Sequence, residues 1–325
     1  MLQTSQTTNP LVSVIVPIYN AAQWLGEMLD SLQNQEYPSW EAILVDDGST
    51  DDSADICRIR AKGDSRFKIV SKPNGGLSSA RNAGLQHAAG QWITFVDADD
   101  ALQPNAIRRL LETARDTHAD IVVGGRDFAV KMGARPMPSL PRVMSPQTAI
   151  RQGLYQRRQL NAAWGNIYRR EIFIPDGPRF TENTWFEDLD IFYRLFERAK
   201  KIAYLPEKLY FYRDNPSSFM NNMSLGRFDV LTVTDRIVEY YRGTPLESAA
   251  RDRRFSACFN LLLLMSATGY DDPARTQQCL ETVRHERLTE IFSPHVRLKN
   301  RLGAIASIFG LRFIRFIARR LRHSH

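Results

Sequence analysis

Between residues 11 and 123, apolar β-branched runs alternate with amphipathic segments, and this order limits the possible folds more than any other feature of the sequence. Residues 11–18 (LVSVIVPI) are an apolar run of the kind that is buried on both faces of a parallel sheet. Asn20 and Gln23 then have the spacing of a helix-capping pair, and apolar residues recur at helical spacing through residue 32. The chain is therefore predicted to begin with a strand followed by a helix.

The same alternation continues along the chain. It predicts further strands at residues 40–45, 67–70, 92–96 and 120–123, and further helices at residues 53–61, 78–87 and 104–117. Strands that alternate with helices form βαβ units, so we expect an α/β fold with a mostly parallel, Rossmann-like sheet. Ligands bind such sheets beyond the carboxyl ends of the strands.

The 325-residue chain is long enough for two lobes, and its pattern changes along its length. We expect a flexible N-terminus at residues 1–9, an α/β lobe at 10–125, a mixed region at 126–224, a helical extension at 225–290 and a basic tail at 291–325. Four prolines indicate loops after the first lobe: Pro136, Pro138, Pro141 and Pro146.

The net charge of +7 comes from the tail. Residues 291–325 hold eight of the 43 Lys and Arg residues and no Asp or Glu, which leaves the rest of the chain near neutral. A basic surface spread over the whole protein is therefore excluded, and we expect no nucleic-acid partner.

A predicted helix in the tail has two unlike sides. Four arginines recur at helical spacing on one side: Arg312, Arg315, Arg319 and Arg322. Four apolar residues fall on the opposite side: Phe313, Ile314, Ile317 and Leu321. Such a helix suits a peripheral position on an anionic membrane. The alternative is that the apolar side packs on the globular body and the arginines are solvated.

Compartment is indicated by three weaker features. The three cysteines are widely spaced, which fits a reducing compartment and not a zinc site. Residues 1–10 lack the pattern of a signal peptide, and the apolar stretch at 261–265 is too short to span a bilayer. We expect a cytoplasmic protein, peripheral on the inner face of the cytoplasmic membrane.

Acidic and glycine-rich turns follow the predicted strands. Asp46 and Asp47 open the turn DDGSTD and could bind a nucleobase or ribose, although turns and helix caps favour the same residues. NGGLSSARNAG leads from a loop into a helix that carries Arg81, so its backbone NH groups and guanidinium could approach phosphate. A simple loop with a helix cap explains this segment equally well.

Three carboxylates follow the strand predicted at 92–96, namely Asp97, Asp99 and Asp100. Such closely spaced acids repel unless they are solvated, protonated or bridged by a cation. Two carboxylates with diphosphate oxygens form the oxygen shell that Mg²⁺ or Mn²⁺ prefers. The alternative is a solvated acidic turn before the next helix.

Glu187 and Asp188 begin a segment rich in aromatic and aliphatic residues, WFEDLDIFYRLF. Carboxylates are favoured electrostatically at a helix N-terminus. Flanking aromatic rings could instead desolvate one carboxylate and raise its pKa toward that of a general base. Local spacing does not choose between the two.

Taken together and in this order, PIYN, DDGSTD, NGGLSSARNAG, DADD and FEDLD resemble glycosyltransferase family 2. The resemblance is most specific over residues 11–101, and to about residue 218 it is similar to bacterial capsule, exopolysaccharide and lipopolysaccharide transferases. It implies a GT-A fold with a helical C-terminal extension, and inverting transfer from a nucleotide-sugar donor, with a UDP-sugar expected, to a glycan or lipid-linked acceptor.

The resemblance also implies roles for individual residues. Pro17, Tyr19, Asp46 and Asp47 would hold the nucleoside, and Arg81 would lie near the phosphates. Asp97 and Asp99 would be the DxD pair, with Asp99 as direct ligand of Mn²⁺ or Mg²⁺ and Asp97 on ribose or metal. Asp188 would be the general base, with Glu187 beside it. Arg213 and Trp164 are possible phosphate or acceptor contacts.

Two other functions compete with this interpretation. A sugar-phosphate nucleotidyltransferase also needs acids on an α/β sheet, but the basic, glycine-rich N-terminal signature of that class is missing. A non-catalytic, membrane-associated nucleotide-binding adaptor would fit the tail, whereas the intact Asp99 and Asp188 favour an enzyme.

Overall fold

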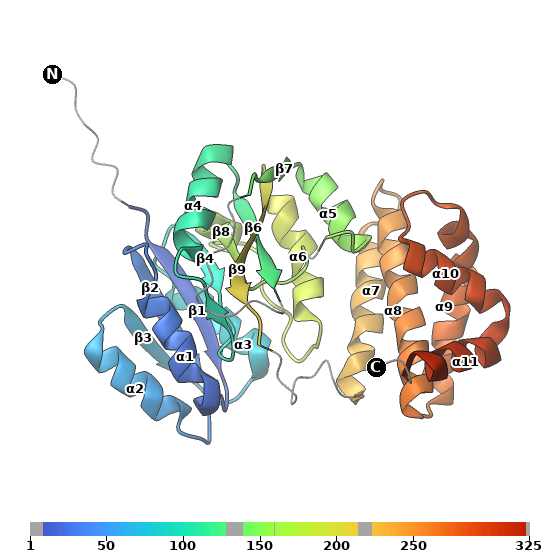
Figure 1. Cartoon of the computed structure of the whole chain (residues 1–325), viewed down its shortest axis with the longest axis horizontal. Coiled ribbons are helices and arrows are strands. Elements are labelled where there is room, and N and C mark those ends of the chain that lie inside the picture. The colour runs from blue at the N-terminus through green and yellow to red at the C-terminus, as the bar shows by residue number, and fades with distance from the viewer. Residues whose placement is uncertain (1–8, 128–138, 159, 214–222, 323–325) are drawn as a thin grey trace. The chain divides into compact units, whose positions relative to one another are not determined.

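The computed structural model describes residues 9–127, 139–158, 160–213 and 223–322. The described chain divides into two compact units (Figure 1). One comprises the described residues within Met1–Pro146, Ala162–Asn183 and Ile191–Asp214, and the other those within Gln147–Asn161, Thr184–Asp190 and Asn215–His325. Residues 1–8 of the predicted flexible N-terminus, and Pro136 and Pro138, lie outside the described residues.

A mixed sheet forms the centre of the first unit. Within the described residues it has nine strands in the order β3-β2-β1-β4-β8-β6-β9-β5, with β7 paired to β9. The strands are β1 (Val12–Ile18), β2 (Trp40–Asp46), β3 (Phe67–Ser71), β4 (Trp92–Phe95), β5 (Ala101–Leu102), β6 (Ile121–Asp127), β7 (Arg142–Met144), β8 (Asn166–Arg169) and β9 (Ile202–Phe211). Strands β1 to β4 pair in parallel, so the predicted α/β class is confirmed. Strand β8, which was not predicted, lies antiparallel between β4 and β6.

The helices of this sheet cover both of its faces. They are α1 (Ala22–Gln33), α2 (Ser53–Gly63), α3 (Gly76–His87) and α4 (Ala106–Thr117), as predicted within a few residues (Figure 1). Side chains of a strand alternate between the two faces, and the core follows this rule in β2. Leu44 belongs to the core cluster that contains residues of α1, α2 and α4, whereas Ile43 and Val45 cluster with Ala80 of α3 on the other face.

The start of α1 differs from the prediction. Asn20 has a φ of 49° and its side-chain oxygen accepts a hydrogen bond from the backbone NH of Thr50, 2.8 Å away, so it caps no helix. Asp51 Oδ2 instead accepts from the NH of Ala22 at 3.0 Å, and Ser53 Oγ accepts from the NH of Ala21 at 2.9 Å. The predicted capping pair is wrong because the turn after β2 supplies the acceptors, and these bonds tie the loops after β1 and β2 together.

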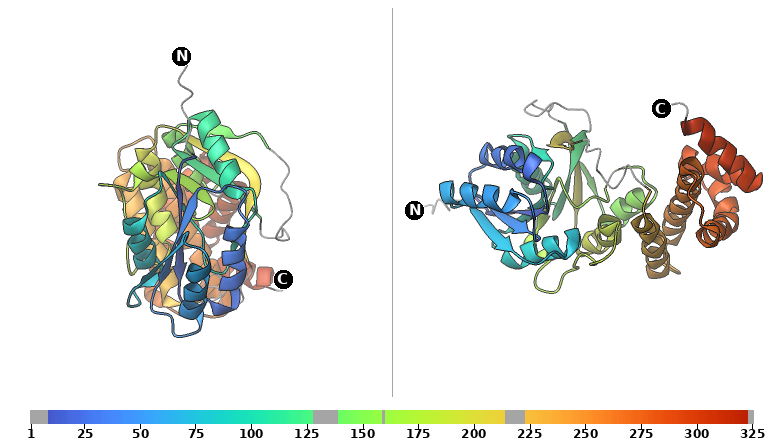
Figure 2. Two further views of the ribbon diagram at one scale, coloured as in Figure 1. Left: turned by 90° about the vertical axis from the view of Figure 1, so that its left-hand side faces the viewer. Right: turned by 90° about the horizontal axis from the view of Figure 1, so that it is seen from below.

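Later helices complete the fold. They are α5 (Pro146–Leu154), η1 (Arg170–Ile172), α6 (Glu187–Arg198), η3 (Leu225–Phe228), α7 (Asp229–Tyr240), α8 (Glu247–Thr268), α9 (Pro273–Phe292), α10 (Leu298–Ile308) and α11 (Gly310–Arg322). In the second unit α8 packs against α7, α9 and α11, which confirms the predicted helical extension (Figure 2). Among the described helices, none has the length and apolar character needed to cross a bilayer.

The tail is helical, and its predicted apolar side is divided. Ile314 and Ala318 of α11 are buried, whereas Phe313 and Phe316 are 38% and 52% exposed. Ile314 packs on the unit, and Phe313, about 100° away around the helix, lies at the exposed edge of that side. The side chains of Arg319, Leu321 and Arg322 lie outside the described residues.

Candidate active site

The carboxyl ends of β1, β2 and β4 meet at one edge of the sheet. Ile18 at the end of β1 is in register with Asp46, and the NH of Val96 donates to the carbonyl of Ile15 at 3.1 Å. Pro17 is buried within β1, and Tyr19 just beyond it is 52% exposed. The parallel pairing therefore brings the polar residues that follow three separate strands to a common edge.

Asp46 and Asp47 are both buried and both stabilise turns. Asp46 Oδ1 accepts from the NH of Ser49 at 3.0 Å, which closes the turn after β2. The carboxylate of Asp47 accepts from the NH of Gly75 at 3.1 Å and of Gly76 at 2.7 Å, and it forms an ion pair with Lys72. Asp47 thus holds the glycine-rich loop at the start of α3.

Lys72 was not identified from the sequence. Its only signal there is its position directly after β3, between that strand and the glycine-rich loop. Besides Asp47, its ammonium group donates to the carbonyl of Pro73 at 2.7 Å. The loop is consequently positioned by one carboxylate and one cation that neutralise each other.

Arg81 lies beside Asp97. The Arg81 side chain is 1% exposed, and its Nη2 donates to Asp97 Oδ1 at 3.0 Å, while the Asp97 side chain is 23% exposed. The guanidinium carbon lies 5.3 Å from the centre of the Phe180 ring. Arg81 therefore supplies a buried positive charge directly behind the first carboxylate of the DADD turn.

Strand β9 returns to the DADD turn and fixes it. Tyr210 Oη donates to Asp100 Oδ2 at 2.7 Å and accepts from the NH of Asp97 at 3.1 Å. The backbone NH of Arg213 donates to Asp100 Oδ1 at 2.9 Å, and its Nε donates to the carbonyl of Asp99 at 2.8 Å. Tyr210 was given no role in the sequence analysis, because nothing local links it to residues so far away in the chain.

The pKa of Asp100 is shifted by its surroundings in this turn. Burial, followed by the nearby negative charge of Asp97, raises the pKa of Asp100 to about 8, against the hydrogen bonds from Arg213 and Tyr210. The turn therefore carries more negative charge than its surroundings neutralise. A divalent cation would offset that excess, and carboxylate oxygens are the donors that Mg²⁺ and Mn²⁺ prefer. Asp97 and Asp99 offer partly exposed carboxylates at this turn, while the described residues hold no group of three or more acidic, histidine or cysteine side chains placed to bind an ion.

Arg213 and Trp164 both lie next to this turn. Besides its bonds to the turn, the Arg213 guanidinium pairs with Glu27 and lies 4.5 Å from the centre of the Trp24 ring. The Trp164 ring packs on Tyr210, with 4.6 Å between ring centres. Both predicted contacts are thus joined to the DADD turn through β9.

Glu187 and Asp188 form the first turn of α6 and belong to the second unit. Both are partly buried. The preceding loop is fixed within this unit, since the NH of Trp185 donates to Asp229 Oδ2 of α7 at 2.9 Å. Asp190, one turn further, is buried and pairs with Arg236 at 3.4 Å. Asp190 therefore has a structural role as the ion-pair partner of Arg236. The assignment of Asp188 as general base stays a prediction.

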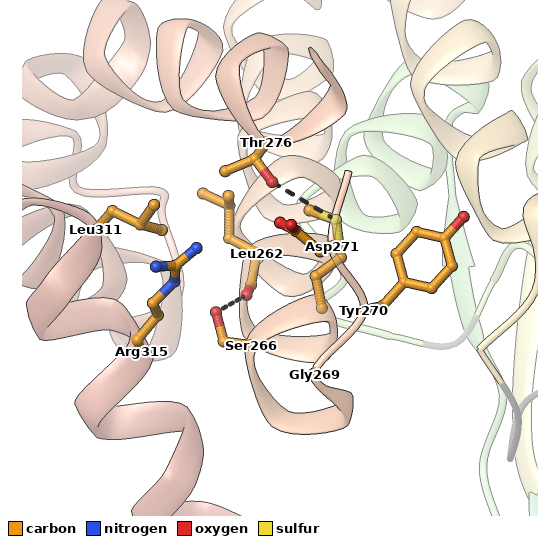
Figure 3. A pocket seen from close by; sticks show the side chains of 9 residues that line it. Leu262, Ser266, Gly269, Tyr270, Asp271, Thr276, Leu311 and Arg315 are labelled. Atoms are coloured by element: carbon orange, nitrogen blue, oxygen red, sulfur yellow. Dashed lines mark hydrogen bonds between the residues drawn. The ribbon is translucent and has the colours of Figure 1, made fainter. Parts of the chain in front are cut away.

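A cavity of about 320 Å³ lies in the second unit, between the end of α8 and α11 (Figure 3). Leu311 and Arg315 of α11 face Leu262 and Thr276 across it (Figure 3). The described residues that line it include none of the predicted site residues, so the candidate active site is not this cavity.

The family model "Glycosyl transferase family 2" matches residues 13–175, which is half of the chain and includes the first three motifs and the DADD turn. The chain belongs to glycosyltransferase family 2. Among curated relatives, it is 38% identical over 217 residues to "Uncharacterized glycosyltransferase EpsJ" of Bacillus subtilis and 32% identical over 216 residues to "Glycosyltransferase GlyA" of Streptococcus pneumoniae. These matches cover 64% and 62% of this chain, but 62% and 30% of the relatives' own lengths.

The fold is similar to that of solved structures. The crystal structure of S. aureus TarS residues 1–349 in complex with UDP-GlcNAc superposes with a TM-score of 0.70 at 20% identity, over 97% of this chain and 92% of that one. The predicted family and the predicted GT-A fold with its helical C-terminal region are therefore confirmed, and the family is one of transferases.

Proposed function

We propose that this chain is an inverting glycosyltransferase. It would move a sugar from a UDP-sugar to a hydroxyl of a glycan or lipid-linked acceptor in bacterial surface polysaccharide synthesis, on the inner face of the cytoplasmic membrane. The observation that carries the proposal is the convergence of Arg81, Asp97, Asp99 and Arg213 at the edge where Asp46 also lies. The UDP-GlcNAc in the TarS complex supports a UDP-linked donor.

The nucleoside would bind at the ends of β1 and β2. Tyr19 is exposed there, and Pro17 lies near the end of β1. Asp46, at the end of β2, is in register with Ile18 of β1. Asp47 is already bound to the backbone of Gly75 and Gly76. We assign it the task of holding that loop against the bound nucleotide.

The diphosphate would bind beside the DADD turn. Asp97 and Asp99 would hold Mn²⁺ or Mg²⁺, which supplies positive charge to the phosphate oxygens when bound. Arg81, held by Asp97, and Arg213, held by the Asp99 carbonyl, place guanidinium groups at the same turn. These cations stabilise the charge that develops on the departing nucleoside diphosphate.

Asp188 would act as the general base at the N-terminus of α6, with Glu187 beside it. It accepts the proton of the acceptor hydroxyl while that oxygen bonds to the anomeric carbon. The bond from this carbon to the phosphate oxygen breaks, and its electron pair leaves with the nucleoside diphosphate. A single displacement of this kind inverts the configuration at the anomeric carbon.

The test is a panel of nucleotide sugars assayed for Mn²⁺-dependent binding and for slow release of UDP with water as acceptor. Asp188→Asn should keep the donor affinity and lower UDP release by about 10²- to 10⁴-fold, the usual effect of losing a general base. Asp116→Asn, a solvent-exposed change on α4, is the control. Full activity of the Asp188 variant would contradict the assignment.

The products separate the competing functions. A nucleotidyltransferase releases pyrophosphate, whereas this proposal requires release of the nucleoside diphosphate. An adaptor would bind a donor without releasing either product.

A further inference from the structure

Helix α10 turns its large apolar side chains outward. Leu298, Leu302 and Ile305 are 68%, 57% and 40% exposed, whereas the buried positions of the helix hold small or polar residues: Asn300, Gly303, Ala304, Ala306 and Ser307. A Cβ atom on Gly303 would lie 2.8 Å from the ring of Phe259, so the small residues allow α10 to pack closely on α8. A helix of a globular protein normally shows the opposite arrangement.

The exposed apolar side continues along α11. Phe309, Phe313 and Phe316 are 66%, 38% and 52% exposed, and their rings form a chain with centre distances of 5.1 and 6.2 Å. Ile314 and Ala318 hold α11 on the unit from its other side. We call Leu298, Leu302, Ile305, Phe309, Phe313 and Phe316 the outer row. Within each helix its members recur every three or four residues, and the contact between the Phe309 and Phe313 rings joins the part before the break at Gly310 to the part on α11.

Positive charge lies near the outer row. Exposed cations stand on the same two helices, among them Lys299, Arg312 and Arg320, and the Arg320 guanidinium carbon lies 5.1 Å from the centre of the Phe316 ring. Residues 291–325 contain no Asp or Glu, so the sequence offers no acid to balance them there. An exposed apolar row with cations beside it marks a binding surface and not ordinary surface composition.

We propose that the outer row docks on the surface of an anionic membrane. The leucine, isoleucine and phenylalanine side chains would enter the boundary between headgroups and acyl chains, and the cations would contact lipid phosphates. A second copy of this chain fits less well, because pairing the two rows would bring cations together without any acid between them. This inference names the surface behind the peripheral location proposed above, and it does not depend on the catalytic assignment.

The first test replaces the aromatic part of the row. Phe309→Ser, Phe313→Ser and Phe316→Ser combined should weaken binding to vesicles of mixed phosphatidylcholine and phosphatidylglycerol by about 100-fold, since the variant has lost the three rings that would leave water for the membrane. Ile59→Ser with Leu288→Ser is the matched control, because both side chains are exposed and lie outside the row. Thermal melting of each variant checks that it is folded.

The second test removes charge. Arg312→Gln with Arg320→Gln should weaken binding to the same anionic vesicles by about 25-fold, as each cation near an anionic surface contributes about fivefold. Binding to vesicles of pure phosphatidylcholine should hardly change. Point variants are needed because truncation before α10 would remove the buried Ala304 and Ile314 and expose the residues that they cover.

The proposal is overturned if the serine variant binds anionic vesicles as the wild type does, or if the wild type does not distinguish anionic from neutral vesicles. It is also overturned if the wild type binds no vesicles but forms a dimer that the serine variant abolishes, which would make the row an interface between copies. All variants should retain wild-type UDP release in solution. Normal vesicle binding without UDP release would contradict the proposed activity and leave the docking surface standing.

Discussion

Asp97, Asp99 and Asp100 follow one strand, yet their surroundings differ. Asp97 is partly exposed and pairs with the buried Arg81, whereas Asp100 is buried and bonded to Tyr210 and Arg213. Asp99 offers its carbonyl to Arg213, which holds the backbone of the turn in place. Asp100 therefore positions the turn, and the carboxylates of Asp97 and Asp99 are the candidates for contact with an ion.

Asp99→Ala tests this division at the scale of a single residue. We expect loss of most metal-dependent donor binding with little change in thermal stability, because a partly exposed carboxylate at a strand end contributes little packing. Calorimetric titration of a UDP-sugar with and without Mn²⁺ measures the effect. Asp116→Ala, on the exposed side of α4, should bind as the wild type does. If the wild type and the Asp99 variant bind the donor equally well with and without Mn²⁺, the proposed metal site at this turn is contradicted.

Site residues could be predicted from the sequence only where a motif of neighbouring residues marks them. Arg81 and Asp97 follow strands and stand in recognisable motifs, so their positions at the sheet edge were predictable. Tyr210 and Lys72 act through contacts between separate segments: the bond from Tyr210 to Asp100 joins residues 110 positions apart, and the ion pair of Lys72 with Asp47 joins residues 25 positions apart. No periodicity or spacing carries that information.

At the scale of elements, α3 shows how a motif can serve packing. A Cβ atom on Gly84, the last glycine of the NGGLSSARNAG segment, would lie 2.4 Å from Ile15 Cγ2 and 3.3 Å from Val45 Cγ2. Gly84 thus lets α3 approach β1 and β2 closely. Arg81 lies on the same helix, so this close packing also fixes its distance from Asp97.

Gly84→Ala should therefore destabilise the first unit although alanine favours helices. We expect a loss of about 1–3 kcal/mol from overpacking, because Ile15 is fully buried and has no room to move. Gly26→Ala in α1 is the matched control. A Cβ atom there meets nothing within 4 Å, so we expect a gain of about 0.5–1 kcal/mol. Chemical denaturation measures both, and a Gly84 variant as stable as the Gly26 variant would contradict the close approach.

The elements themselves were largely predictable, and the exceptions have physical causes. Strand β8 (Asn166–Arg169) is short and owes its place to antiparallel partners on both sides, which its own residues do not reveal. Helix α11 was correctly expected to be amphipathic. Periodicity shows that a helix has two sides, but it does not show which side meets the body. The apolar side of α11 is in fact divided, with Ile314 buried and Phe313 exposed.

At the scale of the whole molecule, the chain passes between its two units several times. Residues 147–161 and 184–190 belong with the helices of the second unit, although both lie among segments of the first. Composition along the sequence can mark boundaries between consecutive segments, but it cannot show that a short internal segment packs with a distant part of the chain. Only tertiary packing determines that residues 147–161 and 184–190 belong to the second unit.

Besides Asp190, three buried acidic side chains lie on α8 and α9 of the second unit, and their bonding partners differ. Glu286 is 2% exposed and pairs with Arg251 and Arg254. Asp252 and Glu290 are fully buried, and the amide of Asn300 donates to Asp252 at 2.9 Å. Burial, followed by the neighbouring Asp252, raises the pKa of Glu290 to about 10. Glu290 therefore keeps its proton in the folded protein at neutral pH.

This shift makes the stability of the second unit depend on pH. A folded pKa above the unfolded value means that the folded state holds a proton which the unfolded state releases above its own pKa of about 4.5. The contribution of Glu290 to the free energy of unfolding is fully present below about pH 4.5. It falls by at most about 1.4 kcal/mol per pH unit as the pH rises toward 10. Glu290→Gln removes the titrating group and keeps a neutral donor next to Asp252.

Calorimetric melting should therefore show that the stability of Glu290→Gln, relative to that of the wild type, increases between about pH 6 and about pH 8. Glu286→Gln, one turn earlier on α9, should behave oppositely. It breaks ion pairs with two arginines and should cost about 3 kcal/mol at both pH values, at the low end for a buried pair because both arginines are partly exposed. The same loss and the same pH dependence in the two variants would mean that Glu290 is charged in the folded protein, and that burial alone does not decide the protonation of acids in this unit.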